Sequence, residues 1–194
     1  MEQMDSLPAG RVFELELFGV TDESTEPFVR PPYMDFESSM AEVIERNLAE
    51  FSWSSDEAYN PMRPNKGNSS LLWTSVKKHL PRRISGFRTV PLSLYISVGR
   101  NALDFWHGVD AFFWWQGVYV SIDASRILKR KIGLWKERLK ADFLITPEDV
   151  SPERLSYLGG QMATVLKGRR LQLRHNQAKR KKLTTVEWID NDPG

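Results

Sequence analysis

The stretch that decides the fold is Asp110–Asp123, which reads DAFFWWQGVYVSID. Residues 118–123 alternate strictly between apolar and polar types, which is the period of a half-buried β-strand. The aromatic run before Gln116 is also typical of a strand. A two-residue turn at Gln116 and Gly117 then predicts an antiparallel hairpin whose paired residue numbers sum to 233. In that register Asp110 lies opposite Asp123.

Helix and strand patterns continue on both sides of this hairpin. Residues 11–19 alternate only in part and predict a short edge strand or an extended arm, and residues 52–70 an exposed excursion. Ser39 and Glu42 fit a capping box, and Ser151 before Pro152 fits another helix start. The spacing predicts helices over residues 40–51, 71–80, 126–140 and from 151 onward, and strands over residues 92–98 and 141–146. This order, helix, three strands, helix, strand and helix, indicates an α/β fold.

Composition excludes several classes of protein. The chain of 194 residues has 41% hydrophobic residues, enough for a packed core, and has no cysteine. Disulfides, thiolate zinc sites and cysteine nucleophiles are therefore excluded. No apolar run reaches membrane-spanning length, and residues 1–11 carry two acids and a proline instead of a signal-peptide pattern. These features predict a cytoplasmic protein with no membrane partner.

Charge is divided unevenly along the chain. Residues 1–60 contain 3 basic and 14 acidic residues, whereas residues 61–194 contain 24 basic and 11 acidic ones. The positive charge is concentrated in residues 126–140 and 167–182. Such concentration is typical of a polyanion-binding surface, although a solvated helix face or a basic tail has the same composition. The acidic N-terminal part is a possible contact for a basic protein partner.

The two aspartates of the hairpin suggest a metal site. Side chains directly opposed in an antiparallel pair have Cβ atoms about 4.5–5.5 Å apart, so two carboxylates there repel each other. A divalent cation removes the repulsion, and Mg²⁺ (or Mn²⁺) prefers such oxygen ligands. The alternative is that Asp110 and Asp123 end their strands and accept backbone hydrogen bonds. A one-residue slip of the register would also separate them.

Two short motifs carry a resemblance to a known family. Gly108-Val109-Asp110 leads one strand, and Ile122-Asp123-Ala124-Ser125 ends the next. With the predicted order of elements, this pattern resembles the PD-(D/E)XK nuclease superfamily over about residues 39–170. The resemblance implies a restriction-endonuclease-like core (αβββαβ), with a mixed central sheet flanked by helices and followed by a C-terminal basic helix. One departure matters, because Ser125 occupies the position of the family's lysine.

The resemblance also implies roles for individual residues. Asp110 and Asp123 would be catalytic and would bind the metal, and Glu45 on the first helix of that core would orient it. Lys129 or Lys131 would replace the missing lysine, unless both simply belong to a basic helix. The nucleic-acid backbone would be held by Lys129, Arg130, Lys131, Arg169, Arg170 and Arg174.

These inferences predict a metal-dependent nuclease that hydrolyses phosphodiester bonds, with DNA as the favoured substrate. The expected organisation is an acidic arm or edge strand over residues 1–36, a nuclease-like domain over residues 37–175, and a basic then acidic tail over residues 176–194. One alternative is a catalytically inactive protein of the same fold that binds nucleic acid. Another is a structural or adaptor component of a larger assembly.

Overall fold

The fold is organised around one mixed β-sheet of four strands. The structure, a computed structural model, describes residues 9–20, 29–53, 59–81, 91–99, 101–126 and 141–189. The strands lie in the order β1-β2-β3-β4, with β1, β2 and β3 antiparallel and β4 parallel to β3. They are β1 (Ser93–Ile96), β2 (Ala111–Trp115), β3 (Val118–Ala124) and β4 (Phe143–Ile145). The fold is therefore mixed α/β, as predicted.

The hairpin of β2 and β3 has the predicted register. Trp115 pairs with Val118 and Phe113 with Val120, as a turn at Gln116 and Gly117 requires. Both turn residues have positive φ angles, 53° at Gln116 and 81° at Gly117, which is the geometry of a type I′ turn. That turn twists in the same sense as the strands it joins, so two residues suffice to fix the register.

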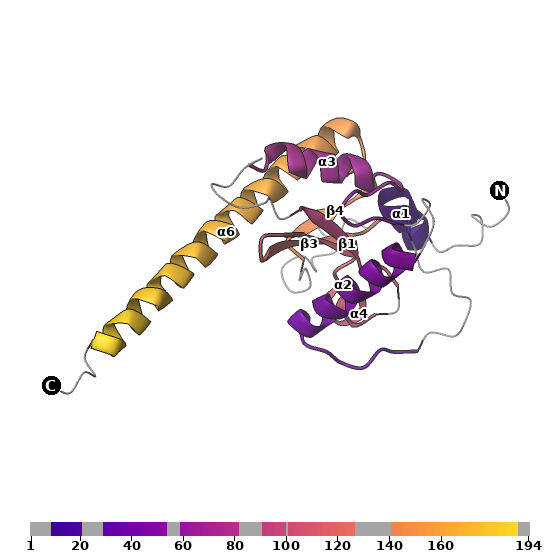
Figure 1. The fold of residues 1–194 in the computed structure, drawn as a ribbon. Coiled ribbons are helices and arrows are strands. Elements are labelled where there is room, and N and C mark those ends of the chain that lie inside the picture. Colours follow the sequence, from indigo (N-terminus) through magenta and orange to yellow (C-terminus); the bar gives the residue numbers. More distant parts are fainter. Residues whose placement is uncertain are drawn as a thin grey trace, which may run out of the picture.

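Helices cover both faces of the sheet (Figure 1). On one face lie α2 (Phe36–Trp53) and α4 (Ala102–His107), and on the other α3 (Ser69–His79) and α6 (Pro152–Ile189). Alternate residues of β2 supply the two cores, since Phe112 packs with the α2 layer and Phe113 with the α3 and α6 layer. The aromatic run of β2 is therefore structural core.

The helices α3 and α6 pack at close range. A Cβ atom on Gly159 would lie 2.6 Å from the Cβ of Ser75, so no larger residue fits at Gly159 without a shift. Ser151 accepts a hydrogen bond from the Arg154 amide at 3.3 Å, and α6 begins at Pro152, as the sequence predicted. A short 3₁₀ helix, η3 (Pro147–Asp149), connects β4 to it. None of the described helices combines the length and the apolar character needed to cross a membrane.

The outer edge of β1 is closed by polar contacts. The Asn47 side chain accepts from the Ile96 amide and donates to the Ile96 carbonyl, both at 3.0 Å. The Leu94 amide donates to the Pro61 carbonyl at 2.8 Å, and the buried Tyr59 hydroxyl donates to the Leu94 carbonyl at 2.9 Å. The segment around Tyr59 is thus partly buried, which corrects the exposed excursion expected there.

The predicted N-terminal arm or edge strand is wrong for the described residues. Residues 9–18 form helix α1 (Ala9–Phe18), and Phe13, Leu17 and Phe18 are buried in the core with α3 and α6. The partial alternation of this segment also fits helical spacing of i, i+4 and i+5, so local pattern alone did not separate the two structures. Helix α1 therefore belongs to the body of the protein.

Two helix boundaries also differ from the sequence predictions. Helix α2 begins at Phe36, and Asp35 caps it by accepting from the Ser38 amide at 3.0 Å, whereas the predicted capping box started at Ser39. At the other end of the chain, α6 runs without a break through residue 175, where the predicted nuclease-like domain ended. The predicted helix over residues 126–140 lies almost entirely outside the described residues.

Candidate active site

Four acidic side chains gather at the end of β2 and β3, and we call them the acidic cluster. Asp110 directly precedes β2, Asp123 lies near the end of β3, Asp104 lies on α4, and Glu14 lies on α1. The charges of Asp123 and Glu14 both raise the pKa values of Asp104 and Asp110. Asp110 and Asp123 are 7% and 6% exposed. Four elements thus bring carboxyl groups to one buried region.

Helix α4 positions Asp104. The Asn101 side chain caps this helix by accepting from the amides of Leu103 at 3.0 Å and Asp104 at 3.1 Å. Gly108 ends it in a left-handed conformation with φ 57°. The Asp104 carboxylate accepts a hydrogen bond from the Gly99 amide at 3.1 Å, which holds it against the end of β1. The sequence analysis missed α4, although Asn101 and Gly108 are recognisable as its start and stop signals.

The sheet positions Asp110. Its amide donates to the Ile122 carbonyl, and its own carbonyl accepts from the Ser97 amide, both at 2.8 Å. Its carboxylate accepts from the Ala124 amide at 2.6 Å, so the side chain reaches across to the end of β3. The paired residues of β2 and β3 end at Ala111 and Ile122, and the bond of the Asp110 amide to the Ile122 carbonyl is one position out of that register, so Asp110 and Ala111 both lie against Ile122. The predicted register therefore holds from the turn to Ala111 and Ile122, and a pair of Asp110 with Asp123 is not among the observed pairs.

The environment of the acidic cluster favours the binding of protons or cations to its carboxyl groups. Burial raises the pKa of Asp104 to about 7, and the charges of Glu14 and Asp123 add to the effect of burial. Hydrogen bonds with the Gly99 amide and with Asp110 act in the opposite direction. Burial also raises the pKa of Asp110 well above its usual range, with the charge of Asp104 as the next cause. Groups perturbed in this way are common at functional sites.

The donor set of the acidic cluster suits a hard cation with few protein ligands. Across the described parts of the chain, no three acidic or histidine side chains converge closely enough to hold a metal ion by themselves. Mg²⁺ commonly takes one or two carboxylates and completes its shell with water and substrate phosphate. Asp110 and Asp123, both buried at the end of the hairpin, could supply those carboxylates. Ser125 follows directly, with its amide donating to the Ile145 carbonyl at 2.9 Å.

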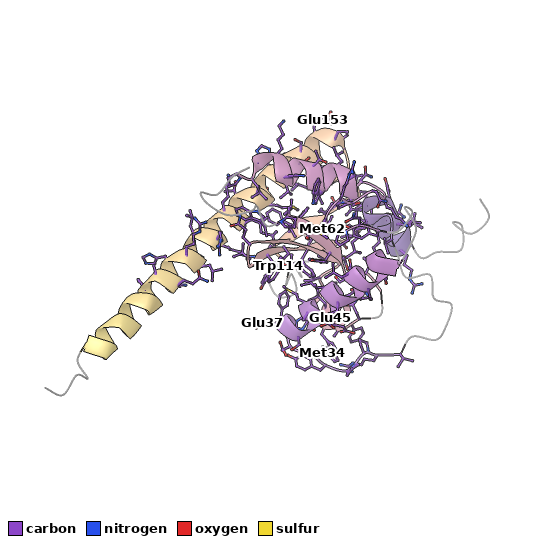
Figure 2. All side chains as sticks on the ribbon, viewed as in Figure 1. Met34, Glu37, Glu45, Met62, Trp114 and Glu153 are labelled. Atoms are coloured by element: carbon purple, nitrogen blue, oxygen red, sulfur yellow. The ribbon has the colours of Figure 1, made fainter. Side chains whose placement is uncertain are left out.

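Glu14 is a glutamate whose charge raises the pKa values of Asp104 and Asp110. Glu45 is exposed on α2, and Figure 2 shows it on that helix. Its charge is not among the causes that shift the pKa values of Asp104 and Asp110, whereas that of Glu14 is. The sequence analysis missed Glu14 because it expected an arm or edge strand where α1 lies. Helical spacing from Phe13 to Leu17 is the signal that would have placed it.

The predicted basic residues fall into three groups. Lys129, Arg130 and Lys131 lie outside the described residues. Arg169 and Arg170 bind the body of the protein, the former through Asp142 and the latter through its Nε, which donates to Gln116 Oε1 at 3.2 Å. Arg174 is exposed one turn further along α6. The structure thus gives Arg169 and Arg170 structural contacts and leaves Arg174 facing solvent.

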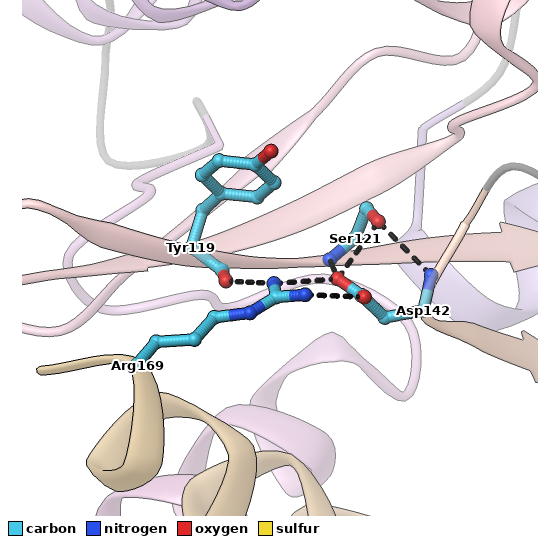
Figure 3. Close-up of polar contacts among 4 residues, drawn as sticks. All are labelled: Tyr119, Ser121, Asp142 and Arg169. Carbon is cyan, nitrogen blue, oxygen red and sulfur yellow. Dashed lines mark hydrogen bonds and ion pairs between the residues drawn. The ribbon is translucent and has the colours of Figure 1, made fainter. Parts of the chain in front are cut away.

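Arg169 forms a bidentate ion pair (Figure 3). Its two terminal nitrogens donate to the Asp142 carboxylate at 2.8 and 2.6 Å, and one also donates to the Tyr119 carbonyl at 2.5 Å. Asp142 also accepts from the Ser121 amide at 2.9 Å. Burial acts to raise the pKa of Asp142, but the hydrogen bonds from Arg169 and Ser121 outweigh it, so the pKa is lowered. This contact fixes α6 to β3.

Comparison of the chain with protein-family models, with curated proteins and with solved structures finds no match.

Proposed function

We propose that this protein is a metal-dependent nuclease that hydrolyses phosphodiester bonds of nucleic acid, with DNA as its substrate. The observation that carries the proposal is the acidic cluster at the end of the hairpin, in which Asp110 and Asp123 are both buried and the charge of Asp123 acts on Asp110. Burial and like charge make that arrangement unfavourable for stability alone. A cation-binding role explains why the chain keeps these carboxylates together.

The topology of the sheet supports the finer fold assignment within this proposal. Strands β1 to β3 form an antiparallel meander, and β4 is parallel to β3. A parallel pair needs a crossover connection, usually a helix. Residues 126–140, where the sequence predicts a helix, are the connection between β3 and β4. This arrangement is consistent with a restriction-endonuclease-like αβββαβ core.

Each carboxyl group has a proposed task. Asp110, fixed by the Ala124 amide, and Asp123 hold Mg²⁺ (or Mn²⁺) between them and the scissile phosphate. Asp104 shares a hydrogen bond with Asp110 and positions it, while Glu14 adds negative charge from α1. When bound, the ion polarises the phosphate and lowers the pKa of the attacking water. The proposed source of the remaining positive charge is Lys129 or Lys131, since Ser125 stands at the family's lysine position.

The test is Mg²⁺-dependent cleavage of duplex DNA by the full chain. Asp123→Ala is expected to abolish cleavage while leaving the circular dichroism spectrum and DNA binding in EDTA unchanged. Glu45→Gln is the matched control, because it removes an exposed acid outside the acidic cluster and should cleave normally. Unchanged cleavage by folded Asp123→Ala protein would falsify the proposed site.

A second candidate is a nucleic-acid-binding protein without catalytic activity. Ser125 at the lysine position favours it, because no positive side chain then follows directly on Asp123 in the sequence. Calorimetric titration with Mg²⁺ and Mn²⁺, followed by cleavage assays with both ions, separates the two candidates. A protein that binds the metal and cleaves DNA supports the nuclease. A protein that binds DNA but neither binds the metal nor cleaves supports the second candidate.

A further inference from the structure

The C-terminal half of α6 leaves the body of the protein. Figure 1 shows α6 crossing above the sheet beside α3 and then continuing outward on its own. Leu173 is the last described residue of α6 that packs against the core. Residues 174–179 are all exposed, and the helix continues to residue 189. At 1.5 Å a residue, the segment from 174 to 189 extends about 24 Å.

This projecting segment is basic at its start, and we call residues 174–182 the basic arm. It contains Arg174, Lys179, Arg180, Lys181 and Lys182, together with His175, and it has no acidic residue. Positions 167, 174 and 181 are all basic and are spaced by seven, so the helix places them in one row. The positive charge of this segment is complementary to a negatively charged partner.

The sequence of the basic arm argues against a hydrophobic partner. The buried face of α6 follows Leu155, Met162, Leu166 and Leu173, at spacings of seven and four. Continuing that face beyond Leu173 gives Gln177 and Arg180, both polar. A coiled coil with a second copy needs apolar residues to continue along one face, and a membrane-surface helix needs an apolar face as well. The basic arm offers neither.

The basic arm directly follows two contacts between α6 and the hairpin that carries Asp123. Just before it, Arg169 binds the Tyr119 carbonyl of β3 and Asp142, and Arg170 binds Gln116 in the hairpin turn. Tyr119 and Asp123 are four residues apart on β3, which is about 13 Å along a strand. The start of the projecting helix is therefore attached to the same strand that carries Asp123.

We propose that the basic arm binds double-stranded DNA along its backbone and major groove, and so presents the duplex to the acidic cluster; the second part rests on the proposed nuclease function. A helix with its side chains is about 10–12 Å wide, and the major groove of B-DNA is about 12 Å wide. Lysine and arginine side chains on such a helix reach phosphates on both sides of the groove. Arg169 and Arg170, which the sequence predicted as DNA contacts, anchor the helix to the body of the protein.

The test is the binding of a 30-base-pair duplex to full-length protein in EDTA, measured over a series of salt concentrations. The variant Arg174→Gln/Lys179→Gln/Lys181→Gln should weaken binding at least about tenfold and reduce the slope of log K against log salt by about 2–3, since each lost phosphate contact contributes about 0.9. The control Arg63→Gln/Lys78→Gln/Arg154→Gln removes the same charge from exposed positions outside the basic arm and should change the affinity less than threefold.

The outcomes distinguish failure of the proposed DNA binding by the basic arm from failure of the nuclease proposal. Equal affinity of the basic-arm variant and wild type, or equal loss in the control, overturns the arm assignment. A basic-arm variant that loses binding to a polyglutamate peptide more than to the duplex points to an acidic protein partner and also overturns it. Wild-type protein that binds the duplex through the basic arm but never cleaves it refutes the nuclease proposal alone.

Discussion

Two groups of aspartates that lie against the β2–β3 hairpin differ in what surrounds the carboxylate. Asp142 lies beside β3 with the guanidinium of Arg169 against it, and its pKa is lowered. Asp104 and Asp110 lie at the end of β2 and β3, where other carboxylates add to the effect of burial, and their pKa values are raised. Burial acts in the same direction at both sites. The partner therefore decides whether a partly buried acid stabilises the fold or destabilises it.

The comparison separates structural from functional acids. Removing the charge of Asp142 should cost stability, because it leaves Arg169 without its partner. Removing a charge from the acidic cluster should cost activity and improve stability at neutral pH. The predictions below test this opposition, from the largest expected effect to the smallest.

The first prediction concerns the rate of cleavage. Asp110→Asn should reduce Mg²⁺-dependent cleavage by more than about 100-fold, the upper range for residues that only support a metal ligand. Asp142→Asn should leave the cleavage rate per folded molecule unchanged. The rate is measured at a temperature at which this variant remains folded. A similar loss in both variants would remove the distinction between the two sites.

The second prediction concerns the ion pair that fixes α6 to β3. Arg169→Met should lower the free energy of unfolding by about 2–3 kcal/mol, less than for a fully buried pair because the guanidinium is partly exposed. The control is Arg154→Met, which breaks a surface pair with Asp149 and should cost less than about 1 kcal/mol. Urea unfolding of both variants measures the difference. Equal losses of unfolding free energy in the two variants would mean that the Arg169–Asp142 ion pair stabilises the protein no more than a surface pair does.

The third prediction concerns pH. An unfolded aspartate loses its proton near pH 3.9, whereas Asp104 in the folded protein does so near pH 7. Between these values the folded state binds more protons, so stability falls as pH rises. Asp104→Asn should therefore stabilise the protein at pH 8 by about 1–2 kcal/mol and have little effect well below pH 4.

Thermal unfolding at several pH values checks that sign. Addition of Mg²⁺ at pH 8 should raise the Tm of the wild type, because the ion replaces the missing protons, and should do so less for Asp110→Asn. A wild type that becomes more stable between pH 5 and pH 8 would contradict the electrostatic interpretation of the acidic cluster.

The fourth prediction compares two glutamates. Glu14→Gln should weaken Mg²⁺ binding by about three- to tenfold, since it removes a nearby charge and not a direct ligand. Glu45→Gln, exposed on α2, should leave the affinity unchanged. Calorimetric titration measures both. A larger loss of affinity in Glu45→Gln than in Glu14→Gln would instead support Glu45, the metal-orienting residue predicted from the sequence.

The sequence predicted local features better than long-range ones. The register of β2 and β3 was predictable, because alternation and a two-residue turn fix it within fourteen residues. Helix α1 was not, since its partial alternation fits two structures and its burial against α3 and α6 decides between them. Because α1 was not predicted, Glu14 was not expected near the aspartates. The contact of Arg169 with Asp142 spans 27 positions of the chain, and no local pattern encodes it.

By itself the sequence determined the hairpin, the position of Asp110 and Asp123 at its open end, and the concentration of positive charge in the C-terminal part. Each follows from residue type and spacing over short distances. Tertiary structure decided which glutamate acts on the pKa values of the aspartates, and which arginines of α6 contact the body of the protein. The reason is that burial and neighbouring charge, which set the role of an ionisable side chain, come from segments distant in the chain and exist only once those segments pack together.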